Sequence, residues 1–206
     1  MGFEHKSGGA AAGEPLWKQY REEFPVTKGL VYLNHAAVAP LPKVSAVAMQ
    51  AFADDALNYG SLHYDQWLDT YEALRCAAGR LIGADRGEIA LIKNTSEGIA
   101  TIAMGMDWRP GDTIVAFSEE FPANYYPWKL LEAQRCYVKW LSIHDSLDVI
   151  EEACEGARLL AISFVQYLSG RRADLNAIGR ICQRHRVFFL VDAIQGLGAF
   201  PLDVRA

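Results

Sequence analysis

The spacing of apolar residues divides the chain into a helical first part and a second part in which strands and helices alternate. Pro40 and Pro42 precede a segment that predicts a helix over residues 43–57. Apolar residues at intervals of three or four positions predict another helix over 64–82. From Glu88 onward, short apolar runs predict strands over 89–92, 113–117, 137–141, 159–165 and 187–191, with helices between them over 96–106, 124–136, 146–155 and 174–186.

This alternation indicates the fold class. Strands joined through helices form βαβ units and a mostly parallel sheet, which helices cover on both faces. We therefore expect an α/β protein with an open, mostly parallel sheet. Ligands of such sheets bind at the carboxyl ends of the strands, so we expect the functional residues there.

Composition and charge exclude several classes of protein. Of the 206 residues, 51% are hydrophobic and 22% are charged, as in globular proteins and unlike a disordered chain. A net charge of −5 argues against nucleic acid as a partner, and no apolar run is long enough to span a membrane. The four cysteines lack C-x-x-C spacing and are expected to be small buried residues. Residues 1–14 are expected to be a flexible leader without a signal-peptide core, which favours a cytoplasmic location.

Polar and aromatic residues follow four of the predicted strands. Thr95 and Ser96 come at the start of a helix, where hydroxyls hold a phosphate or simply cap the helix. Phe121 can lie against a planar ligand or fill the core, and Tyr167 supplies a phenol. Asp192 follows a buried strand, where a carboxylate needs a protonated ring nitrogen, a helix to cap or a structural ion pair.

Together, these hydroxyls, the aromatic ring, the phenol and the carboxylate match the needs of pyridoxal 5′-phosphate (PLP). This cofactor requires an anchored phosphate and an acidic partner for its pyridine nitrogen. A dinucleotide site is a weaker hypothesis, because Gly196-x-Gly198 is followed by Phe200-Pro201 instead of a third glycine and a helix.

Several motifs in this order resemble the class V aminotransferases of PLP fold type I, a group that includes cysteine desulfurases, selenocysteine lyases, kynureninases and isopenicillin N epimerase-like enzymes. The resemblance runs from Tyr32 to Val204. It rests on Tyr32-Leu33-Asn34-His35-Ala36-Ala37, Asn94-Thr95-Ser96-Glu97-Gly98-Ile99, Glu120-Phe121-Pro122-Ala123-Asn124 with Pro127-Trp128, Tyr167-Leu168-Ser169-Gly170 and Val191-Asp192-Ala193-Ile194-Gln195.

The resemblance implies roles around the cofactor. Thr95 and Ser96 would bind its phosphate, and Asp192 would pair with the pyridinium nitrogen and keep the ring protonated. Gln195 matches the position that hydrogen-bonds the 3′-oxygen of the ring.

Other positions depart from the desulfurase pattern or are assigned more loosely. Phe121 occupies the ring-stacking place, where desulfurases usually carry His, which favours the epimerase-like or lyase-like branches. Tyr167 falls where desulfurases often have Asn in contact with the 3′-oxygen. Asn34 and His35 belong to the segment that borders the substrate.

The resemblance also implies a domain organisation. Residues 15–60 correspond to the N-terminal segment of the family's small domain and a linker, and 61–206 to an incomplete PLP-binding large domain. The Schiff-base lysine of the family lies a couple of dozen residues beyond the aspartate, and none of the seven lysines stands in that position. The catalytic residue is therefore unknown, and we expect a truncated chain, inactive alone.

Three hypotheses follow. The first is the N-terminal portion of a PLP-dependent enzyme acting on an amino acid (a lyase, desulfurase, epimerase or transaminase), which would be a homodimer in its full-length form. The second is a non-catalytic remnant of this fold, a binding or interaction module with an exposed sheet edge. The third is a different α/β enzyme, for instance a nucleotide-dependent one.

Overall fold

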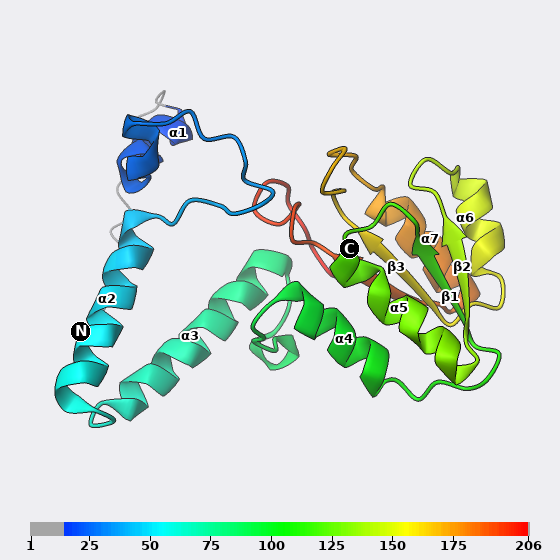
Figure 1. Cartoon of the computed structure of the whole chain (residues 1–206), viewed down its shortest axis with the longest axis horizontal. Helices are drawn as coiled ribbons and strands as arrows, with labels where there is room; N and C mark the ends of the chain where they lie inside the picture. Colours follow the sequence, from blue (N-terminus) through cyan, green and yellow to red (C-terminus); the bar gives the residue numbers. More distant parts are fainter. Residues whose placement is uncertain (1–14, 206) are drawn as a thin grey trace. The chain divides into compact units, whose positions relative to one another are not determined.

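The computed structural model describes residues 15–205, in a chain that forms two compact units, Met1–Leu68 and Asp69–Ala206. The expected leader lies outside the described residues. The first unit contains helix α1 (Leu16–Tyr20), short 3-10 helices at Arg21–Glu23 and Pro25–Lys28, helix α2 (Lys43–Tyr59) and the beginning of α3 (Tyr64–Ile82), which continues into the second unit (Figure 1). The two helices predicted here are confirmed, α2 extending two residues further than expected.

The turn between α2 and α3 is fixed by one carboxylate. Asp55 of α2 lies 2.6 Å from the Nδ1 atom of His63 and accepts a hydrogen bond of 2.9 Å from the indole N–H of Trp67. Gly60 ends α2 with φ at +59°, a conformation that glycine adopts without steric cost. The hydrogen bonds of Asp55 thus join the end of one helix to the beginning of the next.

The second unit contains a parallel sheet of four strands. The strands are β1 (Thr113–Phe117), β2 (Tyr137–Leu141), β3 (Leu159–Ser163) and β4 (Phe188–Asp192), in the order β2-β1-β3-β4. All three neighbouring pairs are parallel, which confirms the predicted α/β class. A short 3-10 helix at Arg86–Glu88 and helix α4 (Thr95–Gly105) precede the sheet. The helices that connect its strands are α5 (Tyr126–Leu130), α6 (Leu147–Cys154) and α7 (Leu175–His185), with short 3-10 helices at Pro122–Asn124 and Leu131–Gln134.

Helices cover both faces of this sheet (Figure 1). On one face, Ala116, Leu159 and Ala161 pack against α4 and α5, where the fully buried Trp128 is the largest side chain. On the other face, side chains of β1 and β3 pack against α6 and α7 in a second core that includes Val115, Phe117, Leu160, Ile162, Cys154 and Cys182. Every residue of β3 is buried, as expected of an inner strand between two helical layers. Three of the four cysteines are buried as predicted, and Cys76 is half-buried.

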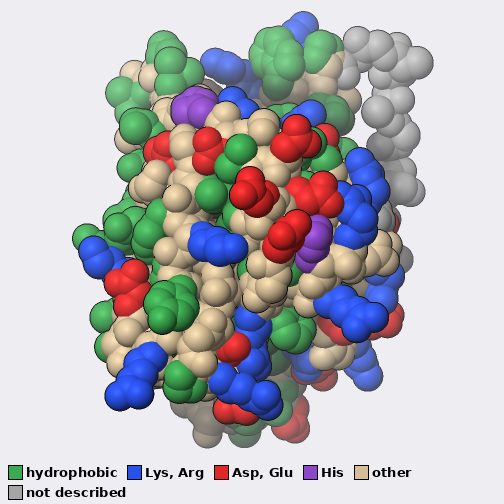
Figure 2. Space-filling view, turned by 90° about the vertical axis from the view of Figure 1, so that its right-hand side faces the viewer, with side chains coloured by type: hydrophobic (Ala, Val, Ile, Leu, Met, Phe, Trp, Pro, Cys, Tyr) green, Lys and Arg blue, Asp and Glu red, His purple; other side chains and the backbone are tan. Residues whose placement is uncertain are grey.

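The outer surface is charged with both signs. Figure 2 shows acidic and basic side chains interspersed on one face. In the second unit, Glu151 of α6 forms an ion pair of 2.7 Å with Arg184 of α7, which joins these two neighbouring helices. In the part of the chain that the structure describes, no helix is long and apolar enough to cross a membrane.

Two predicted elements are corrected by the structure. Residues 89–92 are not a strand: the four-stranded sheet ends at β4, no described residue forms a ladder with them, and a strand is stable only when its backbone groups pair. The helix predicted over 124–136 is shorter and interrupted, because Pro127 favours a start at Tyr126 and the left-handed conformation of Arg135 ends the last turn. Asn124, at the predicted start of this helix, does not cap it: its side chain accepts a hydrogen bond of 2.9 Å from the indole of Trp128 inside the core.

Candidate functional site

A cavity of about 570 Å³ lies between the start of α4 and the carboxyl end of β4. Its volume is typical of sites for small molecules. Two of the predicted residues, Thr95 and Asp192, line it together. The rest of the lining is mostly apolar and consists of Ile92, Asn94, Gly98, Ile99, Ile102, Leu190, Val191, Ala193, Ile194 and Leu197.

The start of α4 is capped by a residue other than the two predicted hydroxyls. The side chain of Asn94 accepts the backbone N–H of Glu97 at 2.9 Å, and the carboxylate of Glu97 accepts the N–H of Lys93 at 2.7 Å. Capping therefore does not account for Thr95 and Ser96, whose hydroxyls have no hydrogen-bond partner among residues 15–205. Both are left at the positive end of a helix of eleven residues, where anions bind.

Asp192 is the last residue of β4 and is 6% exposed. Its carboxylate accepts the backbone N–H of Ile194 at 3.0 Å, and within the described part of the chain no basic side chain pairs with it. Burial raises the pKa of Asp192 above its ordinary value, and the Ile194 hydrogen bond offsets only part of that effect. The residues that follow form a turn rather than a helix, so neither capping nor a structural ion pair explains this carboxylate. A buried acid facing a cavity without a cation fits a ligand that carries a protonated nitrogen.

Phe121 and Tyr167 meet at the carboxyl ends of β1 and β3. Their ring centroids are 5.2 Å apart and the planes are inclined at 77°, an edge-to-face contact. Phe121 is 50% exposed and therefore does not fill the core. The loop of Tyr167 is held by Gln166, whose amide donates to the carbonyl of Glu119 at 2.8 Å. The same Gln166 side chain accepts the backbone N–H groups of residues 168 and 169.

The remaining predicted residues do not line the cavity at Thr95 and Asp192. Gln195 is half-buried in the turn that follows Asp192. Asn34 and His35 are exposed residues of the first unit, where the imidazole of His35 packs edge to face on the ring of Tyr32 at 5.4 Å. The expected position of Asn34 and His35 beside a substrate stays a prediction.

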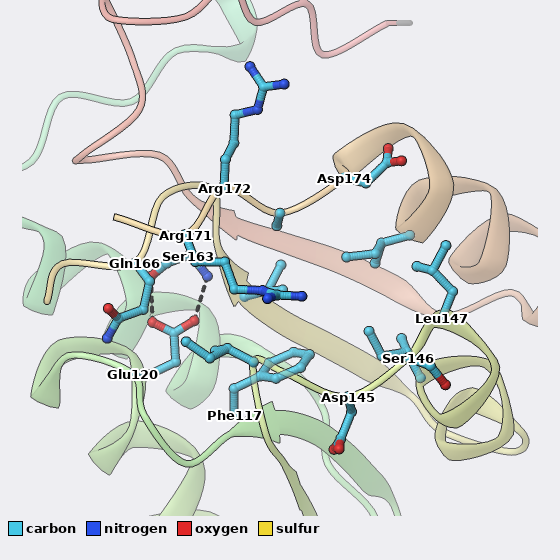
Figure 3. A pocket seen from close by; sticks show the side chains of 15 residues that line it. Phe117, Glu120, Asp145, Ser146, Leu147, Ser163, Gln166, Arg171, Arg172 and Asp174 are labelled. Atoms are coloured by element: carbon cyan, nitrogen blue, oxygen red, sulfur yellow. Dashed lines mark hydrogen bonds between the residues drawn. The ribbon is translucent and has the colours of Figure 1, made fainter. Parts of the chain in front are cut away.

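Sequence analysis missed a buried carboxylate, Glu120, which is 6% exposed. One of its oxygens accepts the backbone N–H of Ser163 at 2.6 Å and the other accepts the Ser163 hydroxyl (Figure 3). Burial raises the pKa of Glu120, as does the negative charge of Asp192, while the Ser163 hydrogen bonds lower it in part. The position of Glu120 in the sequence could have indicated it. Glu120 closely follows the buried strand β1, as Asp192 ends β4, and the carboxyl ends of parallel strands lie at the same edge of a sheet.

Glu119, which precedes Glu120 in the chain, belongs to a separate hydrogen-bond network. Its carboxylate accepts hydrogen bonds from the hydroxyls of Ser142 at 2.6 Å and Ser118 at 2.9 Å, and from the N–H of Ile143 at 3.2 Å. Desolvation raises the pKa of Glu119, but these hydrogen bonds outweigh it and leave the pKa below its ordinary value. Adjacent glutamates thus have opposite pKa shifts.

A second cavity, of about 270 Å³, lies near the starts of α6 and α7 (Figure 3). Its floor is apolar and includes Phe117, Ile150 and Ile162, and Arg171 and Asp145 line it as well. Glu120 and Ser163 also line this cavity, but none of the predicted site residues does. The candidate site is therefore the cavity at Thr95 and Asp192.

Comparison with known proteins gives concordant results. The family model for class V aminotransferases matches residues 31–206. A probable cysteine desulfurase of Methanothermobacter thermautotrophicus is 32% identical over 195 residues, which cover 90% of this chain and 49% of the relative. The chain thus spans about half the length of this relative.

Solved structures share the fold. The apo cysteine desulfurase of Thermococcus onnurineus NA1 matches with a TM-score of 0.84 and 25% identity, over 95% of this chain and 52% of that one. A mutant of C-DES with glycine covalently linked to its PLP cofactor matches with a TM-score of 0.82 and 24% identity, over 90% of this chain and 52% of that one. The family match covers all the motifs of the second unit that carry the predicted site, and the chain belongs to the class V aminotransferase family.

Proposed function

We propose that this chain is the cofactor-binding part of an enzyme that uses PLP to act on an amino acid. The observation that carries this proposal is Asp192, a buried carboxylate without a cationic partner among residues 15–205, in the wall of a cavity that also contains Thr95. PLP is the cofactor of the family, as the sequence predicts. Its protonated ring supplies the missing cation.

Thr95 and Asp192, which line the cavity, and four further residues at the strand ends suit the parts of the cofactor. The unpartnered hydroxyls of Thr95 and Ser96 and the positive end of α4 would hold the phosphate. Asp192 would accept a hydrogen bond from the ring nitrogen, Phe121 would stack on the ring, and Tyr167 and Gln195 would reach its 3′-oxygen. When bound, PLP withdraws electrons from the α-carbon of an amino acid.

We assign no catalytic lysine within the chain. Lys93 is the lysine nearest the site in sequence, but its side chain is 86% exposed and its ammonium lies 3.8 Å from the carboxylate of Glu97. We propose that the 206 residues bind the cofactor without turning over an amino acid, and that transamination, elimination, desulfuration and epimerisation all remain open for the complete enzyme. A cytoplasmic location and a homodimeric complete enzyme are part of the same proposal.

A titration of the purified chain with PLP, followed by absorbance, tests the proposal. We expect saturable binding, and after borohydride reduction no covalent adduct in the intact mass. Asp192→Asn should weaken binding about tenfold or more, because a hydrogen bond between charged groups contributes about 1.5–3 kcal/mol. Asp145→Asn, in the other cavity, is the matched control. Equal affinity of the two variants would contradict the assignment, and a reduced adduct would identify a resident lysine by peptide mapping.

A non-catalytic binding module is the second candidate. The supporting observation is β4, whose outer edge has no neighbouring strand among the described residues and whose Phe188 is 62% exposed. Unpaired edge strands accept strands from other chains. Concentration-dependent association that the charged substitution Phe188→Lys abolishes would favour this candidate.

A further inference from the structure

We propose that Glu120 is a positioning residue of the cofactor site, which fixes Ser163 beside Asp192 and, through its charge, makes Asp192 a stronger proton acceptor. Its importance for the cofactor rests on the proposed function, whereas its effect on Asp192 belongs to the protein alone.

Glu120 and Ser163 form a clamp between two strand ends. Both oxygens of Glu120 are bound by Ser163, one by its N–H and the other by its hydroxyl, across 43 residues of sequence. An ionised carboxylate accepts hydrogen bonds at both oxygens, so this arrangement suits the charged form. The clamp joins the segment after β1 to the end of β3, and Phe121 follows Glu120 directly.

Ser163 lies next to Asp192 in the sheet. These two residues are partners in the parallel ladder of β3 and β4, and neighbouring strands lie about 4.8 Å apart. Side chains alternate along a strand, so Ser163 shares a face with Ala161, and Asp192 shares that face with Leu190. Ala161 lies in the core formed with α4 and α5, and Leu190 packs against it. Ser163 therefore lies between the two carboxylates.

Glu120 and Asp192 are two buried carboxyl groups whose charges interact. Glu120 and Asp192 are both 6% exposed, and the charge of Asp192 contributes to the raised pKa of Glu120. The groups that act on Glu120 are Ser163, Asp192 and the amide of Asn124, and the Ile194 N–H acts on Asp192. None of them is a cation. Because the interaction between two charges is mutual, we infer that an ionised Glu120 in turn favours the protonated form of Asp192, and would favour a protonated ring nitrogen beside Asp192 as well.

The test follows the carboxyl signal of Asp192 by carbon-13 NMR as a function of pH, in the chain without cofactor. In the wild-type protein, we expect a titration in two coupled steps. In Glu120→Gln, we expect a single step, with the midpoint of the Asp192 titration at a lower pH than in the wild type. Glu119→Gln is the matched control, because the neighbouring Glu119 is bound by Ser118 and Ser142 instead. In this variant, the titration of Asp192 should equal that of the wild type.

A second variant keeps the test independent of whether Glu120→Gln folds. Ser163→Ala retains both carboxyl groups but removes one donor to Glu120, so Glu120 should hold its proton to a higher pH and the midpoint of Asp192 should fall. An unchanged Asp192 titration in either folded variant would overturn the proposal. Since PLP is not used, failure of this test is distinguishable from failure of the proposed function.

Discussion

The backbone of Gly196 lies against the ring of Phe164. A Cβ atom added to Gly196 would be 2.3 Å from Cδ1 of Phe164, a ring that is 6% exposed. The N–H of Phe164 also donates to the carbonyl of Asp192 at 2.8 Å. The turn that carries the end of the candidate site is thus seated directly on the end of β3.

Gly196→Ala should therefore destabilise the chain by about 1–3 kcal/mol, because a buried ring must shift to admit the methyl group. Urea unfolding followed by circular dichroism measures this change. Gly105→Ala is the matched control: it lies in α4, an added Cβ meets nothing within 4 Å, and helix propensity predicts a gain of up to about 1 kcal/mol. Equal stability of the two variants would contradict the close packing at Gly196.

The raised pKa of Asp192 should make stability depend on pH. Between the ordinary value of 3.8 and the raised value, the folded chain binds more protons than the unfolded chain, so stability falls as pH rises through this window. Each unit of elevation amounts to about 1.4 kcal/mol once Asp192 is ionised. Asp192→Asn should reduce this fall of stability with rising pH. The contribution from the raised pKa of Glu120 should remain in the variant. Urea unfolding at several pH values measures the free energy of unfolding of both proteins. The same dependence on pH in Asp192→Asn and the wild type would contradict a contribution from the buried Asp192.

The contact of Phe121 with Tyr167 should be separable from the cofactor role of Phe121. Tyr167→Ala should cost about 0.5–1.5 kcal/mol of stability through loss of the edge-to-face pair, whereas Tyr167→Phe retains the ring and should cost less. Phe121→Ala should cause a similar loss and in addition weaken PLP binding. Thermal unfolding and the PLP titration, measured on all three variants, distinguish the two effects. An unaltered PLP affinity in Phe121→Ala would remove Phe121 from the site.

Capping and ligand binding at α4 should respond to different substitutions. Asn94→Ala removes the acceptor for the Glu97 N–H and should cost about 1 kcal/mol of stability. Ser96→Ala should leave stability almost unchanged, because Ser96 is exposed, but should weaken PLP binding. The two measurements are urea unfolding and PLP affinity. A stability loss in Ser96→Ala equal to that in Asn94→Ala would mean that Ser96 shares the capping role.

Much of the second unit was predictable from local sequence. The strands β1 and β2 match the expected bounds, because each is a short apolar, β-branched or aromatic run bounded by turn residues. The run at 89–92 has the same local character, but a strand depends on a partner, and local sequence contains no information on that partner.

The candidate site was predictable only in part. Asp192 is predicted because it follows an apolar run, and the structure places it with Thr95 in the lining of one cavity. Glu120 was not recognised, because a glutamate is ordinarily solvated. Its burial depends on the hydrogen bonds from Ser163, which is 43 residues away in the sequence. The sequence around Ser163 does not predict this contact.

The division of tasks at the start of α4 has a consequence for how this site can change in evolution. Asn94 and Glu97 stabilise the start of the helix, so Thr95 and Ser96 can be exchanged without the loss of fold that would follow if one residue both capped the helix and bound the ligand. Single substitutions at these two positions can therefore change which anion binds, or how tightly it binds, while each intermediate protein still folds and is exposed to selection.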